Sequence, residues 1–395
     1  DADASGQEDA KKFCAAFHKA GAAEVRMVQL PYEVRPDHGK DLRDWLAEGH
    51  TAADFQALAD AAPIVTPQQA AEWGRKRRQR FSDRQIIIGV DESRVVDEAV
   101  AALAAREDIF QRGGMLVEVV RGGNPPAGIA RPKDAPRIGQ IRTPRLRELL
   151  AASAEWITGG EEPERTHPPA WAVASVDARG QWPSIRRLEG VTEIPVLRAD
   201  GSVLQRPGYD PDTGLLFEPQ HAFPEIPSRP GKADAERARD SLLDVVVDFP
   251  FAADAHRAAW VASVLTPIAR YAYYGPAPMF LIDANVRGCG KTLLTDAAGL
   301  IVCGRSMARM TAPRDDDEFR KRITALALAG EPTILIDNVS GMLGSPSLDA
   351  ALTATSWSDR VLGRTEMVTL PLLATWYATG NNIIVVADTA RRIGR

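Results

Sequence analysis

Long apolar runs are missing from this chain, and cysteine is scarce. No stretch reaches the ~18 uninterrupted apolar residues that a membrane-spanning helix needs, so we expect no membrane span. The three cysteines, Cys14, Cys289 and Cys303, lie far apart and form neither a disulfide framework nor a zinc-binding pattern. Such cysteine usage is typical of the reducing cytoplasm, where we expect this protein to act.

An excess of charge of either sign is also missing. The 48 Lys and Arg residues nearly balance the 53 Asp and Glu residues, which leaves a net charge of -5 at pH 7. A nucleic-acid partner would therefore be held by local basic patches rather than by the field of the whole protein. With 45% hydrophobic and 26% charged residues, the composition excludes a disordered or fibrous chain. The 395 residues suffice for about two or three domains.

The two ends of the sequence suggest a longer polypeptide. The chain begins at Asp1 without a methionine and stops on RRIGR. We therefore expect it to be truncated at both ends and to carry an incomplete set of domains.

The hydrophobic pattern predicts an α/β chain that begins with two short stretches. Residues 1–60 alternate helix and strand, with an amphipathic helix over Glu8–Lys19 and a strand over Val25–Leu30. Residues 61–94 are predicted to be a linker that contains the basic run RKRRQR at 75–80. Such a run favours a solvated surface, with a nucleic-acid contact as the alternative.

Residues 95–235 are predicted to form a middle α+β domain. Helices are expected over Val95–Ala105 and Pro144–Trp156, and a strand over Met115–Val120. The segment AWAVASV and those after it have the pattern of short strands and turns, with a hairpin at Asp200-Gly201. No residue in this stretch has catalytic spacing, so its role stays open.

Residues 236–395 alternate helices with buried strands, a pattern typical of a parallel sheet covered by helices. Short apolar strands are expected over Met279–Asp283, Thr333–Ile336 and Ala374–Ala378. A helix over Ala255–Tyr273 is expected to be kinked or broken at Pro267.

The clearest motif is a glycine-rich loop between the first of these strands and a helix. Its last residues are Gly288-Cys289-Gly290-Lys291-Thr292. This strand–loop–helix context is that of a phosphate-binding loop (P-loop, Walker A), in which backbone N–H groups and the helix N-terminus face the phosphates. Lys291 would reach the β- and γ-phosphates of ATP, and the Thr292 hydroxyl would bind Mg²⁺.

One position departs from the usual loop. Asn285 stands where the pattern has glycine, and we expect the loop to close because asparagine tolerates left-handed backbone. A glycine-rich helix cap with an incidental Lys-Thr pair is the alternative, but the motifs that follow favour phosphate binding. The residues expected to contact the nucleotide are Asn285, Gly288, Cys289, Gly290, Lys291, Thr292, Leu293 and, from the third motif, Asn381.

A second motif is an apolar strand that ends in a carboxylate. The run TILID would place Asp337 at the carboxyl edge of the sheet, facing the P-loop, where it can hold the Mg²⁺ shell. The next residue is Asn338, at the position where many ATPases have a glutamate that activates the attacking water. We therefore expect either that Asn338 orients the water or that a carboxylate from elsewhere is the base.

A third motif joins a polar strand tip to two arginines. The strand TWYATGNN ends in Asn381 and Asn382, and an asparagine amide there can bind the γ-phosphate or position the water. An asparagine-rich turn is the alternative. Arg391 and Arg392 follow soon after. A guanidinium there can stabilise charge on a transferring phosphoryl group, in cis or from a neighbouring subunit.

The order of these motifs over residues 236–395 resembles the helicase core of phage and plasmid primase–helicases. These are AAA+-type, RecA-like ATPases close to superfamily 3 helicases. The resemblance implies a γ-phosphate sensor, an arginine finger and homo-oligomeric, hexameric rings. Carried over to this sequence, its catalytic and metal positions are Lys291, Thr292, Asp337, Asn382 or Asn381, and Arg391 or Arg392, with Asn338 as a further catalytic candidate that departs from the usual glutamate.

The start of the chain resembles the later half of a Toprim domain. Asp1-Ala2-Asp3 precedes a helix and a strand, and Lys40-Asp41 lies on the next loop. In that family paired aspartates bind a divalent metal, so the resemblance implies that Asp1 and Asp3 share one Mg²⁺. The alternative is a frayed acidic terminus and a helix cap at Asp41. The acid/base glutamate of the family would lie before Asp1, so half of a primase site is expected.

Together these interpretations predict an ATP-dependent DNA helicase–primase fragment from the replication module of a phage or mobile element. It would hydrolyse ATP with Mg²⁺ to translocate on or unwind single-stranded and forked DNA. A first alternative is an ATP-gated DNA-binding replication initiator without unwinding activity, which Asn338 keeps open. A second is a Toprim nuclease with an ATPase, although no ABC-type signature precedes Asp337.

Overall fold

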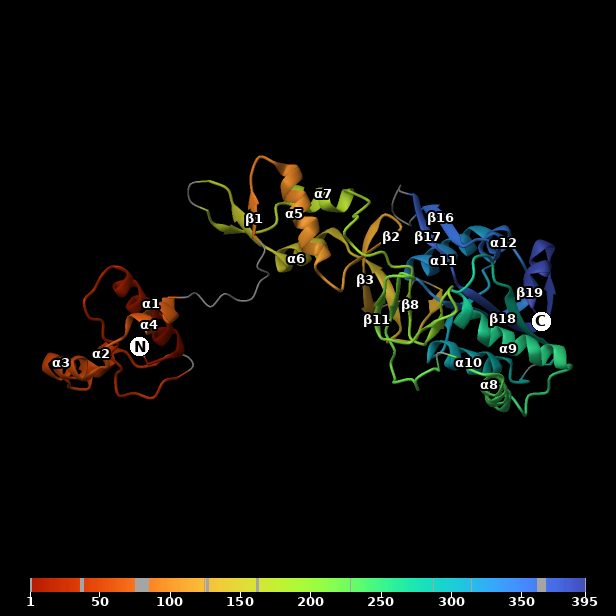
Figure 1. Cartoon of the computed structure of the whole chain (residues 1–395), viewed down its shortest axis with the longest axis horizontal. Coiled ribbons are helices and arrows are strands. Elements are labelled where there is room, and N and C mark those ends of the chain that lie inside the picture. Colours follow the sequence, from red (N-terminus) through yellow and green to blue (C-terminus); the bar gives the residue numbers. More distant parts are fainter. Residues whose placement is uncertain are drawn as a thin grey trace. The chain divides into compact units, whose positions relative to one another are not determined.

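The computed structural model of the chain describes residues 2–35, 39–74, 85–123, 125, 128–160, 163–227, 229–286, 288–313, 315–360 and 367–394. The chain divides into two compact units, Asp1–Phe81 and Ser82–Arg395 (Figure 1). The α/β class expected from the sequence is confirmed, because the second unit combines helices with sheets that contain parallel strands.

The described residues of the first unit form a small helical cluster. Its helices are α1 (Ala4–Lys19), α2 (Leu42–Ala47), α3 (Ala52–Ala61) and α4 (Pro67–Gly74). Helix α1 packs on α4, and the buried residues there include Cys14 and Val65. Side-chain oxygens of Asp3, Asp41 and Thr51 accept hydrogen bonds from the first turns of α1, α2 and α3. These caps satisfy backbone N–H groups that the helices themselves leave unpaired.

Two predictions for the first part of the chain differ from this unit. The expected strand over Val25–Leu30 is replaced by a single bridge between Arg26 and Ile64, because Val25 packs into the helical cluster and no described neighbour offers a strand edge. Helix α4 lies within residues 61–94, which were expected to be a linker, and its Ala70 is buried. The basic run at 75–80 lies outside the described residues.

The second unit is built on a sheet whose strand order, in the described residues, is β19-β13-β18-β15-β14-β4. The strands are β4 (Ile129–Ala130), β13 (Met279–Ala284), β14 (Ala308–Thr311), β15 (Thr333–Leu343), β18 (Thr375–Val385) and β19 (Ile393–Gly394). Neighbours pair in parallel except β14 and β4. Strand β18 lies between β13 and β15, so the carboxyl ends of these three strands meet at one edge.

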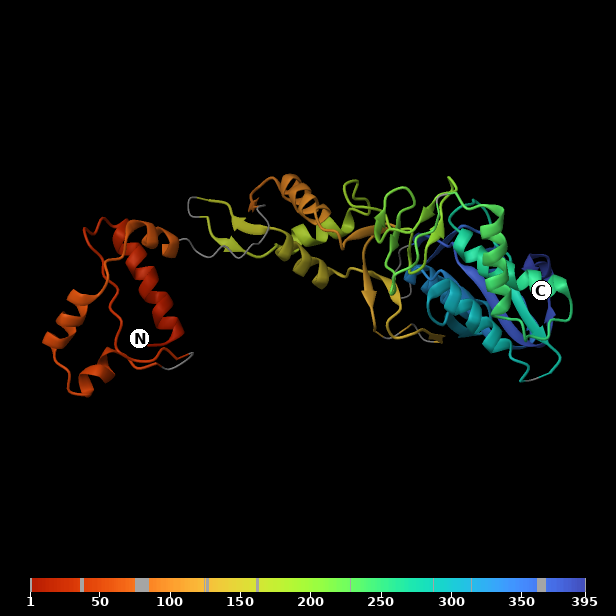
Figure 2. The same ribbon diagram turned by 60° about the horizontal axis from the view of Figure 1, so that its bottom comes forward.

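Helices cover both faces of this sheet (Figures 1 and 2). They are α9 (Asp254–Ala269) and α10 (Lys291–Cys303) on one face, and α11 (Asp316–Ala329) and α12 (Pro346–Thr353) on the other. Strand alternation explains the two layers, because Leu335 and Tyr377 pack with α9 and α10 while Ile336 and Ala378 pack with α11 and α12. The prediction of a parallel sheet covered by helices is therefore confirmed.

Smaller elements complete this part of the unit. Helix α9 continues through Pro267 to Ala269, so the expected break at the proline is absent. Strands β16 (Ser356–Arg360) and β17 (Met367–Pro371) form an antiparallel hairpin. The two other elements are helix α8 (Lys232–Asp244) and the 3₁₀ helix η1 (Ala387–Arg392).

Residues 85–227 form the rest of the second unit, in two groups. The first packs helices on the sheet β1-β6-β7, and its elements are β1 (Gln85–Ile88), α5 (Glu92–Ala104), α6 (Thr143–Ser153), β6 (Glu155–Thr158), β7 (Arg165–Thr166) and α7 (Ala170–Ala178). The second consists of β2 (Phe110–Arg112), β3 (Met115–Arg121), β5 (Pro136–Gln140), β8 (Gly190–Thr192), β9 (Val196–Leu197), β10 (Val203–Leu204), β11 (Gly208–Asp210) and β12 (Leu215–Phe217).

The segment AWAVASV is helical, so the prediction of a strand there was wrong. Helix α7 buries Ala172, Val173 and Val176 against α5 and α6. These positions recur at helical spacing, but a short apolar run fits either a strand or a buried helix. Here the segment is a helix because it packs against the two helices α5 and α6.

Arg112 ties β2 to α11 and β17. Its side chain is buried, and its guanidinium donates hydrogen bonds to the carbonyl oxygen of Ala327 (2.6 Å), in the last turns of α11, and of Pro371 (3.0 Å), at the end of β17. Burial lowers the pKa of Arg112 to about 10. Together with the pairing of β4 to β14, this contact joins the predicted middle domain and ATPase core into one compact unit.

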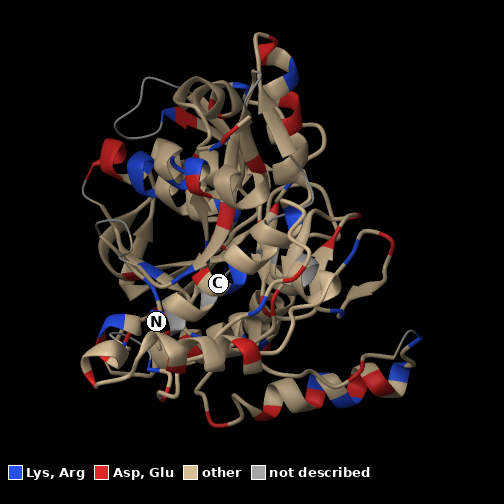
Figure 3. Ribbon diagram, turned by 90° about the vertical axis from the view of Figure 1, so that its left-hand side faces the viewer, with Lys and Arg blue, Asp and Glu red and all other residues tan. Residues whose placement is uncertain are grey.

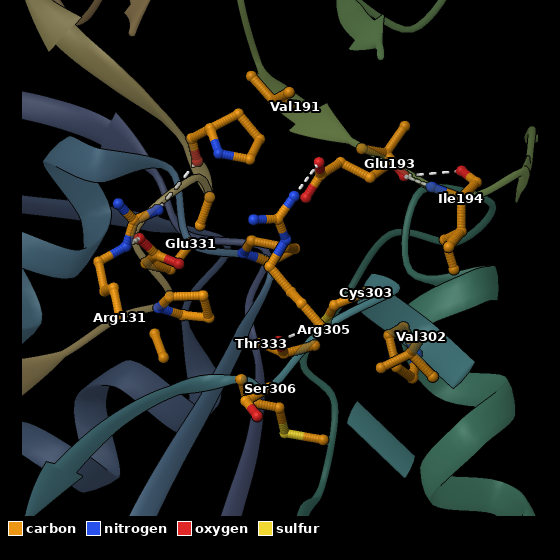
Figure 4. A pocket seen from close by; sticks show the side chains of 18 of the residues that line it. Arg131, Val191, Glu193, Ile194, Val302, Cys303, Arg305, Ser306, Glu331 and Thr333 are labelled. Atoms are coloured by element: carbon orange, nitrogen blue, oxygen red, sulfur yellow. Dashed lines mark hydrogen bonds and ion pairs between the residues drawn. The ribbon is translucent and has the colours of Figure 1, made fainter. Parts of the chain in front are cut away.

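Two ion pairs lie at the same junction and line a small cavity (Figure 4). Arg131, beside β4, pairs with Glu331, and both side chains are 7% exposed. Glu193 pairs with Arg305 close by. Burial raises the pKa of Glu331 to about 7, against the opposing effect of the Arg131 charge.

Candidate nucleotide-binding site

Residues 285, 286 and 288–290 are the described residues between β13 and α10. Gly288 and Gly290 have φ angles of 76° and 85°, in the left-handed region that favours glycine. Asn285 does not have a positive φ, so the loop does not use the left-handed conformation that asparagine tolerates. No side chain caps the N-terminus of α10. Its first N–H groups therefore keep the capacity to bind an anion.

Lys291 connects this loop to the third motif. Its ammonium group donates a hydrogen bond of 2.8 Å to Oδ1 of Asn381 on β18. It also donates to the carbonyl oxygen of Val286 (3.2 Å) and to Sγ of Cys289 (3.4 Å). Two sequence-predicted residues, Lys291 at the start of α10 and Asn381 on β18, are thus brought together.

The first turn of α10 carries the next two predicted residues. Thr292 and Leu293 are both exposed, and Leu293 is 64% exposed despite its apolar side chain. In a P-loop the backbone amide at the Leu293 position is the contacting group.

Asp337 is held by residues on both neighbouring strands. Thr379 Oγ1, on β18, donates a hydrogen bond of 2.6 Å to Oδ1 of Asp337 and accepts one of 3.1 Å from the backbone N–H of Asn338. On the other side, Nη1 of Arg309 on β14 lies 3.7 Å from Oδ2 of Asp337. Arg309 also pairs with Asp296 of α10.

Sequence reasoning missed Thr379 and Arg309 as functional candidates. Thr379 belongs to the third motif, but only the two asparagines that follow it were predicted to have a role. Arg309 was detectable as a lone charge within the otherwise apolar segment Met307–Met310 that precedes the Asp337 strand. Both residues act on the orientation of one carboxylate.

The two strands that carry these motifs are longer than predicted. Strand β15 continues past Asp337 to Leu343, and β18 continues past Asn382 to Val385. The register of β15 against β18 shifts between Ile336 and Val339. Asn338 and Asn382 have φ angles of 55° and 51°. The asparagines therefore occupy irregular positions inside strands rather than strand tips, and both are exposed.

The two arginines differ in their surroundings. Arg392 donates a hydrogen bond of 2.9 Å to the carbonyl oxygen of Asp349 on α12, and its guanidinium lies 3.2 Å from the Asp349 carboxylate. Arg391, on the same short helix η1, is exposed. The prediction named both residues, and the structure gives Arg392 a partner in the same chain.

A cavity of about 530 Å³ opens beside the loop. Sequence reasoning did not find it, because its aromatic wall comes from residues 249–260, which carry no motif. Its lining residues include Phe249, Phe251, His256, Trp260, Asp283, Asn285, Cys289, Gly290 and Lys291.

The predicted Toprim residues have structural partners in the first unit. Asp3 accepts hydrogen bonds from the N–H groups of Gly6 (2.6 Å) and Gly39 (3.4 Å). Asp41 caps α2, and Lys40 pairs with Glu48. Asp1 lies outside the described residues. Among the residues that the structure describes, no group of three or more His, Cys, Asp or Glu side chains could hold a metal ion.

The residues around the loop fit a nucleoside triphosphate with Mg²⁺. Lys291 supplies a cation beside amides that no side chain caps, and Thr292 and Asp337 supply oxygen donors of the kind Mg²⁺ takes alongside phosphates. A cavity of this size is in the usual range for ligand sites. Along the ribbon, Lys and Arg are interspersed with Asp and Glu (Figure 3).

Comparisons with known proteins add little. No family model and no curated protein matches this chain. Among solved structures, one of JCV helicase with a bound acetamide compound is similar at 12% identity and a TM-score of 0.24, over 40% of this chain and 50% of that one. The chain thus spans about half the length of that helicase chain, and a TM-score this low carries no argument. In the described part of the chain, no helix has the length and apolarity to cross a membrane.

Proposed function

We propose that residues 236–394 form an Mg²⁺-dependent ATPase that drives unwinding of, or translocation on, DNA. The observation that carries this proposal is the hydrogen bond between Lys291 and Asn381, because it joins the P-loop lysine to the polar motif of the adjacent strand. Asp337 lies on the next strand of the same sheet. In parallel α/β sheets, ligands bind at this carboxyl edge.

Each residue has a distinct role in the proposed site. Lys291 and the loop amides would bind the phosphates, while Thr292 and Asp337 would hold Mg²⁺, which would supply neutralisation of the phosphate charge. Thr379 fixes the Asp337 carboxylate through its 2.6 Å hydrogen bond. Asn381 or Asn382 contacts the γ-phosphate. An asparagine cannot accept the proton of the attacking water, so Asn338 orients the water without being its base.

A lysine substitution tests the ATPase proposal. We expect Lys291→Ala to weaken binding of a fluorescent ATP analogue by about 10-fold or more, because the loop keeps its amides but loses a charged hydrogen-bond donor. Lys232→Ala is the matched control, since Lys232 is 90% exposed on α8, away from the cavity. Equal affinity in Lys291→Ala and the control would refute the P-loop assignment.

The DNA part of the proposal has a second candidate. Asn338 in place of a glutamate favours an ATP-gated initiator that binds DNA without opening it. A strand-displacement assay on forked duplex separates the two functions. Unwinding that requires ATP would support the helicase function. ATP turnover without strand displacement would exclude it and would favour the initiator.

The ring and primase parts of the proposal rest on resemblance. A homo-hexameric ring would place the exposed Arg391 of one subunit at its neighbour's nucleotide, while Arg392 anchors η1 to α12 through Asp349. Priming would belong to the Toprim-like stretch at 1–60, with Mg²⁺ at Asp1 and Asp3. Binding of Mn²⁺ that is lost in Asp3→Asn, with the helical fold retained, would support this metal site.

A further inference from the structure

The cavity beside the P-loop has an aromatic wall that no phosphate contact requires. Phe249 lies directly against the loop, since a Cβ atom on Gly290 would be 3.2 Å from Cε1 of the Phe249 ring. The rings of Phe249 and Phe251 are tilted at 45° with centroids 6.5 Å apart. Trp260 of α9 lines the same cavity.

Most polar groups along the wall are already engaged within the protein. Ser263 donates its hydroxyl to the carbonyl oxygen of Trp260 (2.7 Å), and the Trp260 indole donates to that of Leu294 (3.4 Å). Asp283 accepts a hydrogen bond from the backbone N–H of Ile383. Away from the loop itself, His256 is the described lining residue that has an exposed polar side chain.

Stacking and base reading impose different demands on a pocket. Every nucleobase presents an aromatic face, so stacking on phenylalanine tolerates any base and favours the larger purines. Discrimination between bases needs fixed donors and acceptors that leave a wrong base unpaired. A single exposed imidazole can donate or accept according to its tautomer, so it discriminates poorly.

We propose that this cavity is the nucleoside site of the chain and that it binds purines by stacking on Phe251 without reading the base edge, so that ATP and GTP bind alike. This inference rests on the proposed ATPase site, because the loop that ends in Lys291 supplies the phosphate contacts. Phe251 is the stacking residue because Phe249 is packed against Gly290.

Inorganic tripolyphosphate separates the base pocket from the phosphate loop. We expect Phe251→Ala in the full chain to weaken ATP binding at least 5-fold while leaving tripolyphosphate affinity unchanged. Phe251→Leu keeps apolar bulk without an aromatic ring and should lose affinity in the same direction. Lys291→Ala should weaken both ligands. The control is Phe223→Ala, which removes an exposed ring outside the cavity.

The outcomes distinguish the two levels of the proposal. If tripolyphosphate does not bind, or binds equally to Lys291→Ala, the phosphate site itself is wrong. If it binds through Lys291 but Phe251→Ala and Phe251→Leu bind ATP like the unaltered chain, only the nucleoside pocket is wrong.

A panel of four nucleotides tests the tolerance for the base. Competition titrations with ATP, GTP, CTP and UTP should give ATP and GTP affinities within about 3-fold of each other and weaker binding of the pyrimidines. His256→Ala should change the ATP-to-GTP ratio little. A preference of more than about 10-fold between ATP and GTP would overturn the inference, since it requires base-edge reading.

Discussion

Arg309 lies between two carboxylates, one of which is proposed to bind metal. Its guanidinium pairs with Asp296 and lies 3.7 Å from Oδ2 of Asp337. A cation at this position opposes the approach of a divalent metal to the same carboxylate. Arg309 therefore has two opposing effects on metal binding: its charge repels the metal, and its contact with Asp337 helps to orient the carboxylate.

We expect Arg309→Gln to bind Mn²⁺ about 3-fold to 10-fold more tightly, because a positive charge beside Asp337 is removed. The gain should shrink at high salt, which screens this repulsion. Isothermal titration of Mn²⁺ in the presence of ADP measures it, with Arg165→Gln, at a 70% exposed site on β7, as the control. Weaker Mn²⁺ binding in Arg309→Gln would mean that orientation of Asp337 outweighs repulsion.

Glu331 predicts a pH dependence of stability. Its pKa is raised to about 7 in the folded chain, above the ~4.3 of an exposed glutamate. The folded state therefore holds this proton at higher pH than the unfolded state does. Its contribution to the free energy of unfolding is full below about pH 4 and is lost as the pH rises through about 7.

As the pH is raised from about 5.5 to 8, Glu331 should lower the free energy of unfolding by roughly 2 kcal/mol. Glu331→Gln keeps the shape of the side chain but cannot titrate, so its stability relative to the unaltered chain should rise over this range. Urea unfolding of both proteins at several pH values measures the difference. If the free energies of unfolding of the two proteins change with pH in the same way, the prediction is wrong.

The placement of the candidate residues was predictable where it follows from residue type and order. Lys291, Asp337 and Asn381 lie at one edge of the sheet, as their positions after apolar strands indicate. Thr379 and Arg309 were missed because their importance depends on which strands are neighbours. The hydrophobic pattern of the sequence indicates where strands lie but not which strands are neighbours. It therefore cannot predict contacts between strands.

At the scale of elements, irregular strands carry the candidate site. Asn338 and Asn382 have left-handed backbone inside β15 and β18, a conformation that costs most residues about 1 kcal/mol or more. Both strands were predicted to end too early, because polar residues interrupt the apolar pattern. The strands continue because Leu343 and Ile383, beyond these interruptions, are buried apolar side chains.

A pair of substitutions separates backbone from side chain at Asn382. Asn382→Gly should retain stability because glycine accepts the φ of 51°, whereas Asn382→Ala should lose about 1 kcal/mol. If the amide senses the γ-phosphate, ATP turnover should fall in both variants. Denaturant unfolding and ATPase rates are measured side by side. Full turnover in Asn382→Gly would exclude the sensor role.

At the scale of the whole molecule, the arginines of η1 connect mechanism to assembly. We expect Arg391→Ala to keep ATP affinity but to lower turnover by about 10³-fold, because a finger contacts the transferring phosphoryl group. In a ring-forming version of the protein, mixing this variant with Lys291→Ala should restore part of the ATPase activity. Such mixing creates interfaces with one intact P-loop and one intact Arg391.

The control for this mixing experiment is Arg392→Ala. Its side chain binds Asp349 of the same chain, so its loss should lower the free energy of unfolding and should not be complemented by Lys291→Ala. Absence of recovery with Arg391→Ala, despite demonstrated subunit exchange, would mean that Arg391 does not act across an interface.

The buried guanidinium of Arg112 has a consequence for how force passes through the molecule. It donates hydrogen bonds to carbonyl oxygens on α11 and β17, and withdrawing it would break both of them. This contact therefore restrains β2 against movement relative to α11. If the ATPase proposal holds, a displacement of α11 during turnover would be passed directly to β2 through this one side chain.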